Sequence, residues 1–190
     1  MDVTPCPRQK HEIVKIGLVS DTHMPHSARR LPDQLVRAFR EQRPDIIAHM
    51  GDFTSLEVRD MLERFAPVEA IAGNNDGPDI VRIFGRRKIL EVGDVRIGMV
   101  HGDGSAKTTV ERAWRSFSNE KVHAVLFGHS HIPYCEQREG VWLVNPGSPT
   151  DKRRNPLYSY GMLEVKNGQI IPKLYFFARD GRSAAPDRRL

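Results

Sequence analysis

Apolar and polar positions alternate along the first two thirds of the chain in blocks that predict strands separated by helices. Short runs rich in valine and isoleucine are typical of buried strands, and they cover Ile13–Ser20, Asp45–Gly51, Val68–Gly73, Arg96–His101 and His123–Gly128. Between them, apolar residues follow helical spacing around 31–39, 56–65 and 105–118. This βαβ rhythm predicts a sheet with parallel strands.

The pattern changes in the later part of the chain, where pairs of apolar runs flank short turn sequences. The turns are Gly93-Asp94, Glu139-Gly140 and Asn167-Gly168, and Asn-Gly is the strongest short signal for a β-hairpin. Crossovers followed by hairpins predict an α/β fold of two mixed sheets that pack face to face, with helices outside.

The length and the chain ends predict one domain. The 190 residues fit a single domain, and we expect it to cover residues 12–178. Residues 1–11 are rich in proline and polar groups, and residues 179–190 lack periodicity, so we expect both to be flexible tails. No repeat and no linker interrupts the chain between them.

Composition and charge narrow the partners. Hydrophobic content of 39% and charged content of 28% are ordinary for a globular protein. No apolar run approaches the roughly 18 residues of a membrane span, and two cysteines, Cys6 and Cys135, cannot form a disulfide framework. We therefore expect a cytoplasmic protein with no membrane partner. The net charge is +5, but residues 1–10 and 179–190 carry +1 and +2 of it, so nucleic acid is not an expected partner.

All five predicted strands end in polar residues of one chemical kind. The ends are VSDTH, HMGD, AGNND, HGD and FGHSH. Ligand sites in open α/β sheets form at the carboxyl ends of strands, so we expect these ends to open into one crevice. In extended backbone, residues two apart point to the same side, which would aim Asp21 with His23, and His129 with His131, into the same pocket.

The donors at these ends indicate a metal site. Imidazole and carboxylate without thiolate suit Mn²⁺, Fe²⁺, Co²⁺, Ni²⁺ or Zn²⁺. Each residue taken alone is also explained as a turn residue, a helix cap or a structural histidine. The set is harder to explain in that way, because seven donors exceed the needs of one tetrahedral ion and predict a dinuclear site with a shared carboxylate.

The order Asp-x-His, Gly-Asp, Gly-Asn, His-Gly and Gly-His-x-His resembles the signature of the calcineurin-like metallophosphoesterases. GNNDG (73–77), GHSHIP (128–133) and NPGS (145–148) are similar to motifs of its small phosphodiesterase branch, which includes the YfcE type and a retromer subunit. The resemblance runs from about Ile16 to Phe177. It implies a four-layer α/β/β/α sandwich and hydrolysis of small or nucleotide-like phosphodiesters by a hydroxide held between two divalent ions, with Mn²⁺ as the first choice.

The resemblance also implies roles for individual residues. Asp21, His23 and His131 would hold one ion, Asn74, His101 and His129 would hold the other, and Asp52 would bridge them. Asp52, Asn74 and His101 would therefore also be the catalytic set. Many relatives carry a histidine directly after the ligand asparagine as a proton donor. This chain has Asn75 there, and a carboxamide is not an acid at neutral pH.

Three further residues are candidates for substrate contact: Asn75, His26 and Asp103. His26 is more simply explained as an exposed loop histidine, and Asp103 is more simply explained as a loop cap. His49 and His123 are most simply structural, and Asp76 is expected to accept hydrogen bonds from its turn or from a ligand histidine.

Two other functions stay open at this stage. One is a binding scaffold that has kept the fold and lost turnover, although the full ligand set argues against it. The other is a nuclease, which would need a basic groove or a capping domain. The resemblance allows a homo-oligomer, but no pattern in the sequence marks an interface.

Overall fold

The computed structural model describes residues 13–180 and 183–184. The first half contains β1 (Ile13–Val19), α1 (Asp33–Gln42), β2 (Ile46–His49), α2 (Glu57–Glu63), β3 (Val68–Ala70), α3 (Pro78–Phe84), β4 (Arg87–Val92) and β5 (Val95–Val100). The second half contains α4 (Thr109–Arg115), β6 (Ala124–Leu126), β7 (Tyr134–Arg138), β8 (Val141–Asn145), β9 (Tyr158–Lys166), β10 (Gln169–Phe177) and β11 (Ser183–Ala184).

The strands form two mixed sheets, as the sequence predicts. The first has the order β11-β10-β9-β1-β2-β3, and the second has the order β4-β5-β6-β8-β7. β1, β2 and β3 run parallel, and so do β5, β6 and β8. The three predicted hairpins are confirmed, because β4 pairs with β5, β7 with β8 and β9 with β10 in antiparallel register.

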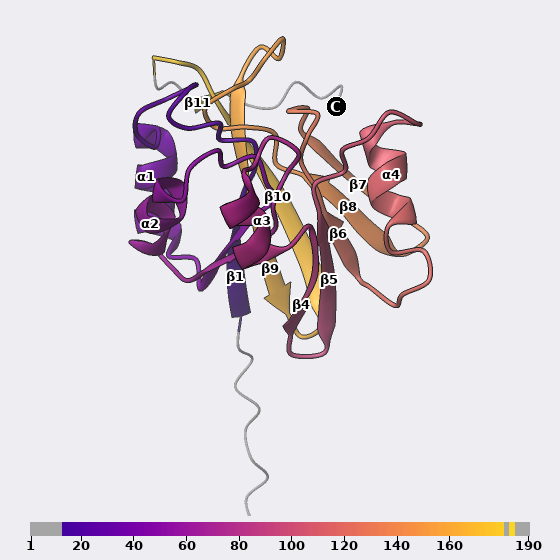
Figure 1. Ribbon diagram of the computed structural model, residues 1–190. Helices are drawn as coiled ribbons and strands as arrows, with labels where there is room; N and C mark the ends of the chain where they lie inside the picture. The colour runs from indigo at the N-terminus through magenta and orange to yellow at the C-terminus, as the bar shows by residue number, and fades with distance from the viewer. Residues whose placement is uncertain (1–12, 181–182, 185–190) are drawn as a thin grey trace, which may run out of the picture.

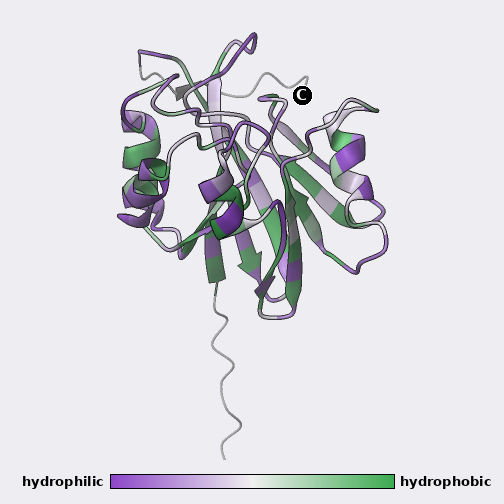
Figure 2. Cartoon of the chain, in the orientation of Figure 1, coloured by the Kyte–Doolittle hydropathy of each residue, from purple (hydrophilic) through white to green (hydrophobic). Residues whose placement is uncertain are grey.

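Three apolar clusters define four layers, which confirms the α/β/β/α sandwich (Figure 1). The central cluster lies between the sheets and includes Ile16, Leu18 and Met99. The outer clusters join the first sheet to α1 and α2, and the second sheet to α4. Side chains alternate along β1, so Gly17 faces α1, where the Phe39 ring would lie 2.8 Å from an added Cβ. Figure 2 shows the same division, with apolar strands at the centre and polar residues outside.

Two differences from the sequence prediction concern helices. Helix α3 was not predicted, although Gly77 precedes it, Pro78 occupies its first turn and Gly85 follows it. These are ordinary signals for a helix start and stop, but the segment is only seven residues long and buries a single side chain, Ile80. The helix predicted over 105–118 is shorter, because it begins after Thr108, whose side chain accepts a hydrogen bond from the Glu111 N–H.

The chain ends lie largely outside the described residues. Residues 1–11 of the predicted N-terminal tail fall there, as do 181–182 and 185–190 of the C-terminal one. Within the latter, Ser183–Ala184 pairs with the end of β10. Among the helices of the described residues, none has the length and apolar character to cross a bilayer.

Candidate metal centre

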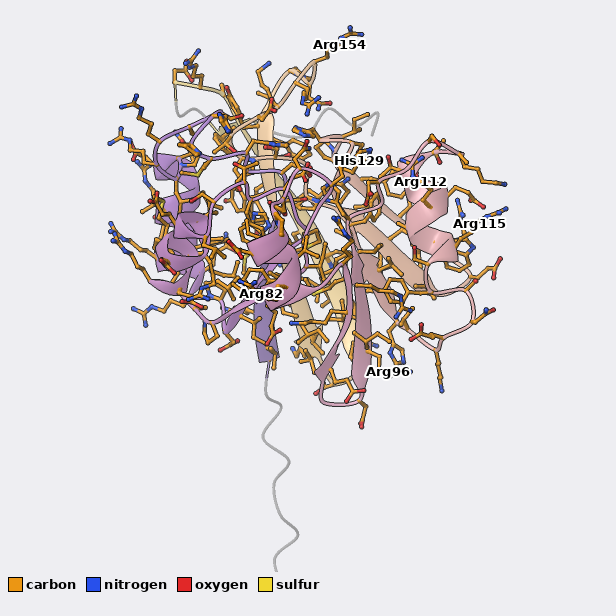
Figure 3. The ribbon with its side chains drawn as sticks, viewed as in Figure 1. Arg82, Arg96, Arg112, Arg115, His129 and Arg154 are labelled. Carbon is orange, nitrogen blue, oxygen red and sulfur yellow. The ribbon has the colours of Figure 1, made fainter. Side chains whose placement is uncertain are left out.

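The predicted strand ends meet at one end of the molecule. The Asp21 N–H donates to the Gly51 carbonyl, and the His23 N–H donates to the Asp52 carbonyl, each at 3.0 Å. These bonds join the loop after β1 to the loop after β2. The loop after β6 joins from the other sheet, because the His129 N–H donates to Asp21 Oδ2 at 3.0 Å. Loops of both sheets therefore build one site, and His129 marks its position in Figure 3.

Asp21, His23 and His131 form the first ligand cluster. One ligand atom from each lies within 4.8 Å of the other two. The Nε2 atoms of His23 and His131 are 3.2 Å apart, and His131 Nε2 lies 3.6 Å from Asp21 Oδ1. All three residues are buried. Two imidazoles and a carboxylate at these distances could hold one divalent ion.

Asp21, Asp52 and His101 form a second cluster, which shares Asp21 with the first. His101 Nε2 lies 3.3 Å from Asp52 Oδ2 and 3.9 Å from Asp21 Oδ1. Asp52 Oδ2 also lies 3.5 Å from His23 Nε2. The Asp52 carboxylate is therefore located between the imidazoles of the two clusters, which is where a bridging ligand is needed.

Asn74 and His129 complete the set on its more exposed side. His129 Nδ1 lies 2.9 Å from Asn74 Oδ1, and the rings of His129 and His101 have centroids 5.2 Å apart. Asn74 is exposed and His129 is half-buried. The structure thus brings all seven predicted ligands together, while their division between two ions stays a prediction.

The backbone that presents the ligands is not extended. Five of the seven ligands have positive φ angles: Asp21 (54°), His23 (45°), Asp52 (59°), His129 (66°) and His131 (57°). The expectation that extended backbone aims residues two apart into one pocket is therefore wrong. Left-handed turns gather these side chains instead. Such turns are unfavourable for residues other than glycine, so the hydrogen bonds around the site must stabilise them.

The hydrogen bonds of two histidines leave nitrogen lone pairs facing the clusters. The Met50 carbonyl can only accept, so His101 Nδ1–H donates to it at 2.6 Å. In the neutral ring Nε2 is then unprotonated, faces two carboxylates, and has no well-aligned hydrogen-bond partner in the described part of the chain. His131 Nδ1–H likewise donates to the Asp151 carbonyl, so its Nε2 lone pair faces His23. A cation would pair with His101 Nε2 and would replace the contact between His131 Nε2 and His23 Nε2, so the donor set fits divalent metal.

The electrostatics of the site agree with a place for positive charge. Burial raises the pKa of Asp21 to about 7, although His101 opposes this shift. Burial lowers the pKa of His101, but the facing Asp52 and Asp21 carboxylates outweigh it and raise that pKa to about 9. Burial also raises the pKa of Asp52, but His101 and Asn75 outweigh it and hold it well below its usual range. The two carboxylates therefore favour positive charge beside His101 Nε2, where a metal ion is predicted.

Asn75 and Asp76 hold the loop that follows β2. Asp76 accepts the backbone N–H groups of Asp52, Thr54 and Gly73, each at 2.8 Å, which confirms its expected role in the turn. Asn75 donates its backbone N–H to Asp52 Oδ1 at 2.8 Å and its Nδ2 to Oδ2 at 2.6 Å. The sequence suggested Asn75 only as a substrate contact and missed this grip on the bridging carboxylate.

The loop after β8 donates hydrogen bonds to backbone carbonyls of the site, a role that the sequence analysis did not assign to it. Ser148 Oγ donates to the Asp21 carbonyl at 2.8 Å, and Thr150 Oγ1 donates to the Thr22 carbonyl at 2.6 Å. Asn155 Nδ2 donates to the His131 carbonyl at 2.7 Å. The signal for this role was the NPGS motif, which was used only as a mark of resemblance.

Asp103 and three histidines of the described residues, His26, His49 and His123, belong to neither ligand cluster. His49 is fully buried, accepts the Gly51 N–H at Nδ1 and contacts Thr22 through Nε2. His123 accepts the Arg96 N–H. Both are structural, as predicted. His26 and Asp103 are exposed on loops beside the site, and their contact with substrate stays a prediction.

Comparison with known proteins shows similarity both in sequence and in fold. The family model described as the calcineurin-like phosphoesterase superfamily domain matches residues 14–168. A probable metallophosphoesterase from Methanocaldococcus jannaschii is 36% identical over 161 residues, 83% of this chain and 80% of the relative. A phosphodiesterase of the same archaeon is 28% identical over 148 residues, 70% and 83% of the two chains. Vps29 from Chaetomium thermophilum has a TM-score of 0.78 at 16% identity, over 90% of this chain and 95% of that chain, a likeness of fold alone.

Proposed function

The chain belongs to the calcineurin-like phosphoesterase superfamily, and on this premise we propose that it is a metal-dependent phosphodiesterase of small or nucleotide-like esters. The observation that carries the proposal is the buried Nε2 of His101, which faces the carboxylates of Asp52 and Asp21 without a well-aligned hydrogen-bond partner in the described residues. A purely structural histidine would be expected to pair this nitrogen.

The proposed site holds two divalent ions, with Mn²⁺ as the first candidate. Asp52 lies between the two groups of ligands and is proposed to bridge them. One ion would be held by Asp21, His23 and His131, and the other by Asn74, His101 and His129. When bound, two such ions would lower the pKa of water toward neutrality and neutralise charge on the phosphoryl oxygens.

Two neighbouring asparagines are proposed to position the substrate and Asp52. The Asn74 amide is exposed beside His129 and is proposed to orient a phosphoryl oxygen. Asn75 keeps Asp52 in place through two hydrogen bonds. Since Asn75 cannot act as an acid, a basic leaving group must take its proton from His26, Asp103 or solvent. The preference for diesters is supported by the relative named a phosphodiesterase.

Metal reconstitution tests the proposal directly. Chelator-treated protein receives one type of ion at a time, and bound ions per chain are counted beside turnover of bis(p-nitrophenyl) phosphate and p-nitrophenyl phosphate. We expect two ions per chain and faster cleavage of the diester. His101→Asn should lose the second ion and most turnover. His123→Asn is the matched control, because the His123 ring accepts a hydrogen bond from the Arg96 N–H and belongs to neither ligand cluster among the described residues.

Each contrary outcome contradicts a different part of the proposal. Two bound ions without turnover of any ester would favour the scaffold function. One ion per chain with full turnover would refute the dinuclear site. Faster cleavage of the monoester would refute the assignment as a phosphodiesterase.

A further inference from the structure

A short loop after β8, residues 151–155, is fastened to the back of a predicted metal ligand. Asn155 Nδ2 donates to the His131 carbonyl and to the Lys152 carbonyl, at 2.7 Å and 2.9 Å. Lys152 Nζ donates in turn to the Asn155 carbonyl at 2.7 Å and lies over the Tyr158 ring. The ends of this loop are therefore fixed relative to His131.

Asp151 links this loop to His131 and to Arg153. Its carbonyl accepts the His131 Nδ1–H, and its Oδ2 lies 3.8 Å from the same nitrogen. The carboxylate also accepts Arg153 Nε at 3.1 Å and the Arg153 backbone N–H at 3.3 Å. Arg153 itself adopts a left-handed φ of 51°, which a residue with a side chain keeps only where its surroundings hold it.

The guanidinium of Arg153 retains free donors. Only Nε is used within the described residues, and 57% of the side chain is exposed. Arg112, the other arginine whose charge reaches a predicted ligand, differs in this respect. Its Nε and both terminal nitrogens donate to acceptors of the loop at 102–109. Arg112 therefore organises that loop, whereas neither terminal NH₂ group of Arg153 donates to a residue that the structure describes.

Arg153 lies outside both clusters of predicted metal ligands. His131 turns Nε2 toward the ligand cluster and Nδ1 toward Asp151, so its imidazole ring lies between the cluster and Asp151, the residue that binds Arg153 Nε. Arg153 Nε lies 3.1 Å from Asp151 Oδ2, and that oxygen lies 3.8 Å from His131 Nδ1. Arg153 is therefore one residue removed from a predicted ligand and is not itself part of the ligand clusters.

We propose that Arg153 is a specificity-determining residue that binds a second phosphate group carried by the phosphodiester substrate. The planar guanidinium can donate two parallel hydrogen bonds to phosphate oxygens. Asp151 holds Nε and so aims the two NH₂ groups. The preferred substrate is then a phosphodiester in which one of the two esterified groups carries a second phosphate. This inference rests on the proposed function of the same site.

Two matched esters test the inference: the 5′-(p-nitrophenyl phosphate) of thymidine, and the same compound with a 3′-phosphate. The metal-loaded parent should prefer the second ester by about 10- to 100-fold in kcat/KM, mainly through a lower KM, because hydrogen bonds between charged groups are worth that much. Arg153→Gln should remove the preference and leave cleavage of the plain ester unchanged within about twofold. Arg153→Lys should keep part of it, since charge remains and the planar fork is lost.

Arg154→Gln is the matched control, because Arg154 neighbours Arg153 and extends away from the body of the protein (Figure 3). It should retain the full preference. The inference is overturned if the parent shows no preference, or if Arg153→Gln keeps it. An equal loss on both esters would instead indicate that Arg153 acts only by positioning Asp151 and His131, which also overturns the inference.

Binding without turnover separates this inference from the proposed function. Calorimetry compares thymidine 3′,5′-bisphosphate with thymidine 5′-phosphate on metal-loaded protein. We expect tighter binding of the bisphosphate to the parent and no difference for Arg153→Gln. If the parent cleaves neither ester yet shows this difference, the proposed function fails and the phosphate site stands. If binding of the two nucleotides is equal in the parent, the phosphate site is refuted.

Discussion

Adding a single methyl group at Gly128 should disable the site without disturbing the backbone. The φ of Gly128 lies outside the left-handed region, so alanine can adopt this conformation. Space is the obstacle, because an added Cβ would lie 1.9 Å from Ser20 Oγ and 2.7 Å from Asp21 Oδ2. Ser20 Oγ donates to that same carboxylate oxygen at 2.6 Å.

The size of the effect follows from these distances. An ordinary contact begins near 3.4 Å, so the Ser20 hydroxyl must move by about 1.5 Å, and the Asp21 carboxylate must move with it. A displacement of about 1 Å in a catalytic group can lower the rate about 100-fold. Overpacking of this kind typically costs about 1–3 kcal/mol in the free energy of unfolding. Gly128→Ala should therefore fold with reduced stability and lose about 100-fold in kcat.

The assay measures kcat on an aryl phosphodiester at saturating metal, together with bound ions and Tm. Gly98→Ala is the control, since its Cβ would lie 2.8 Å from the Phe117 ring, which packs in the outer apolar cluster between the second sheet and α4. It should lose stability and retain kcat. Ser20→Ala removes only the hydrogen bond and should reduce kcat less than Gly128→Ala. A folded Gly128→Ala protein with parental kcat and metal content would refute the argument that Asp21 must keep its place.

Three further predictions concern single residues. Asp52→Asn should lose at least one bound ion and about 100-fold or more in turnover. Metal analysis and turnover are compared with those of Asp79→Asn, an exposed substitution that changes the charge equally. Two bound ions with normal turnover would contradict the role of Asp52 as a bridging ligand. Aryl diesters should be cleaved much faster than alkyl ones, and Asn75→His should flatten the dependence of rate on leaving-group pKa, by up to about 10²–10⁴-fold for the slowest esters; a shallow dependence in the parent would assign the acid elsewhere. Burial lowers the pKa of His49 from about 6.5 in the unfolded chain to about 3 in the folded protein. Below pH 6.5 the unfolded chain binds a proton that the folded protein does not bind. The free energy of unfolding therefore falls as the pH drops from about 6.5 toward about 3. Urea unfolding of the metal-free proteins should show the parent losing about 2 kcal/mol more than His49→Asn between pH 7 and pH 5, and equal losses would contradict this.

Local patterns in the sequence predicted most of the elements and the residues that gather at the candidate site. Strands and hairpins were predictable because apolar periodicity and turn residues act over a few positions. The predicted ligands could be expected to lie together because parallel strands bring their carboxyl ends to one edge. Helix α3 escaped prediction because its seven residues are too few to show a periodic face.

The tertiary structure alone decided how the donors are held. The left-handed turns at Asp21 and His23 depend on partners distant in sequence, since Ser148 and Thr150 support Asp21 and Thr22 from 127 and 128 positions away. The grip of Asn75 on Asp52 spans 23 positions, which no local pattern can encode. The same is true of Arg153, because a basic run in the sequence does not reveal which arginine keeps free donors. Sequence periodicity specifies which residues reach an edge, whereas hydrogen bonds between distant loops fix the direction in which each side chain points.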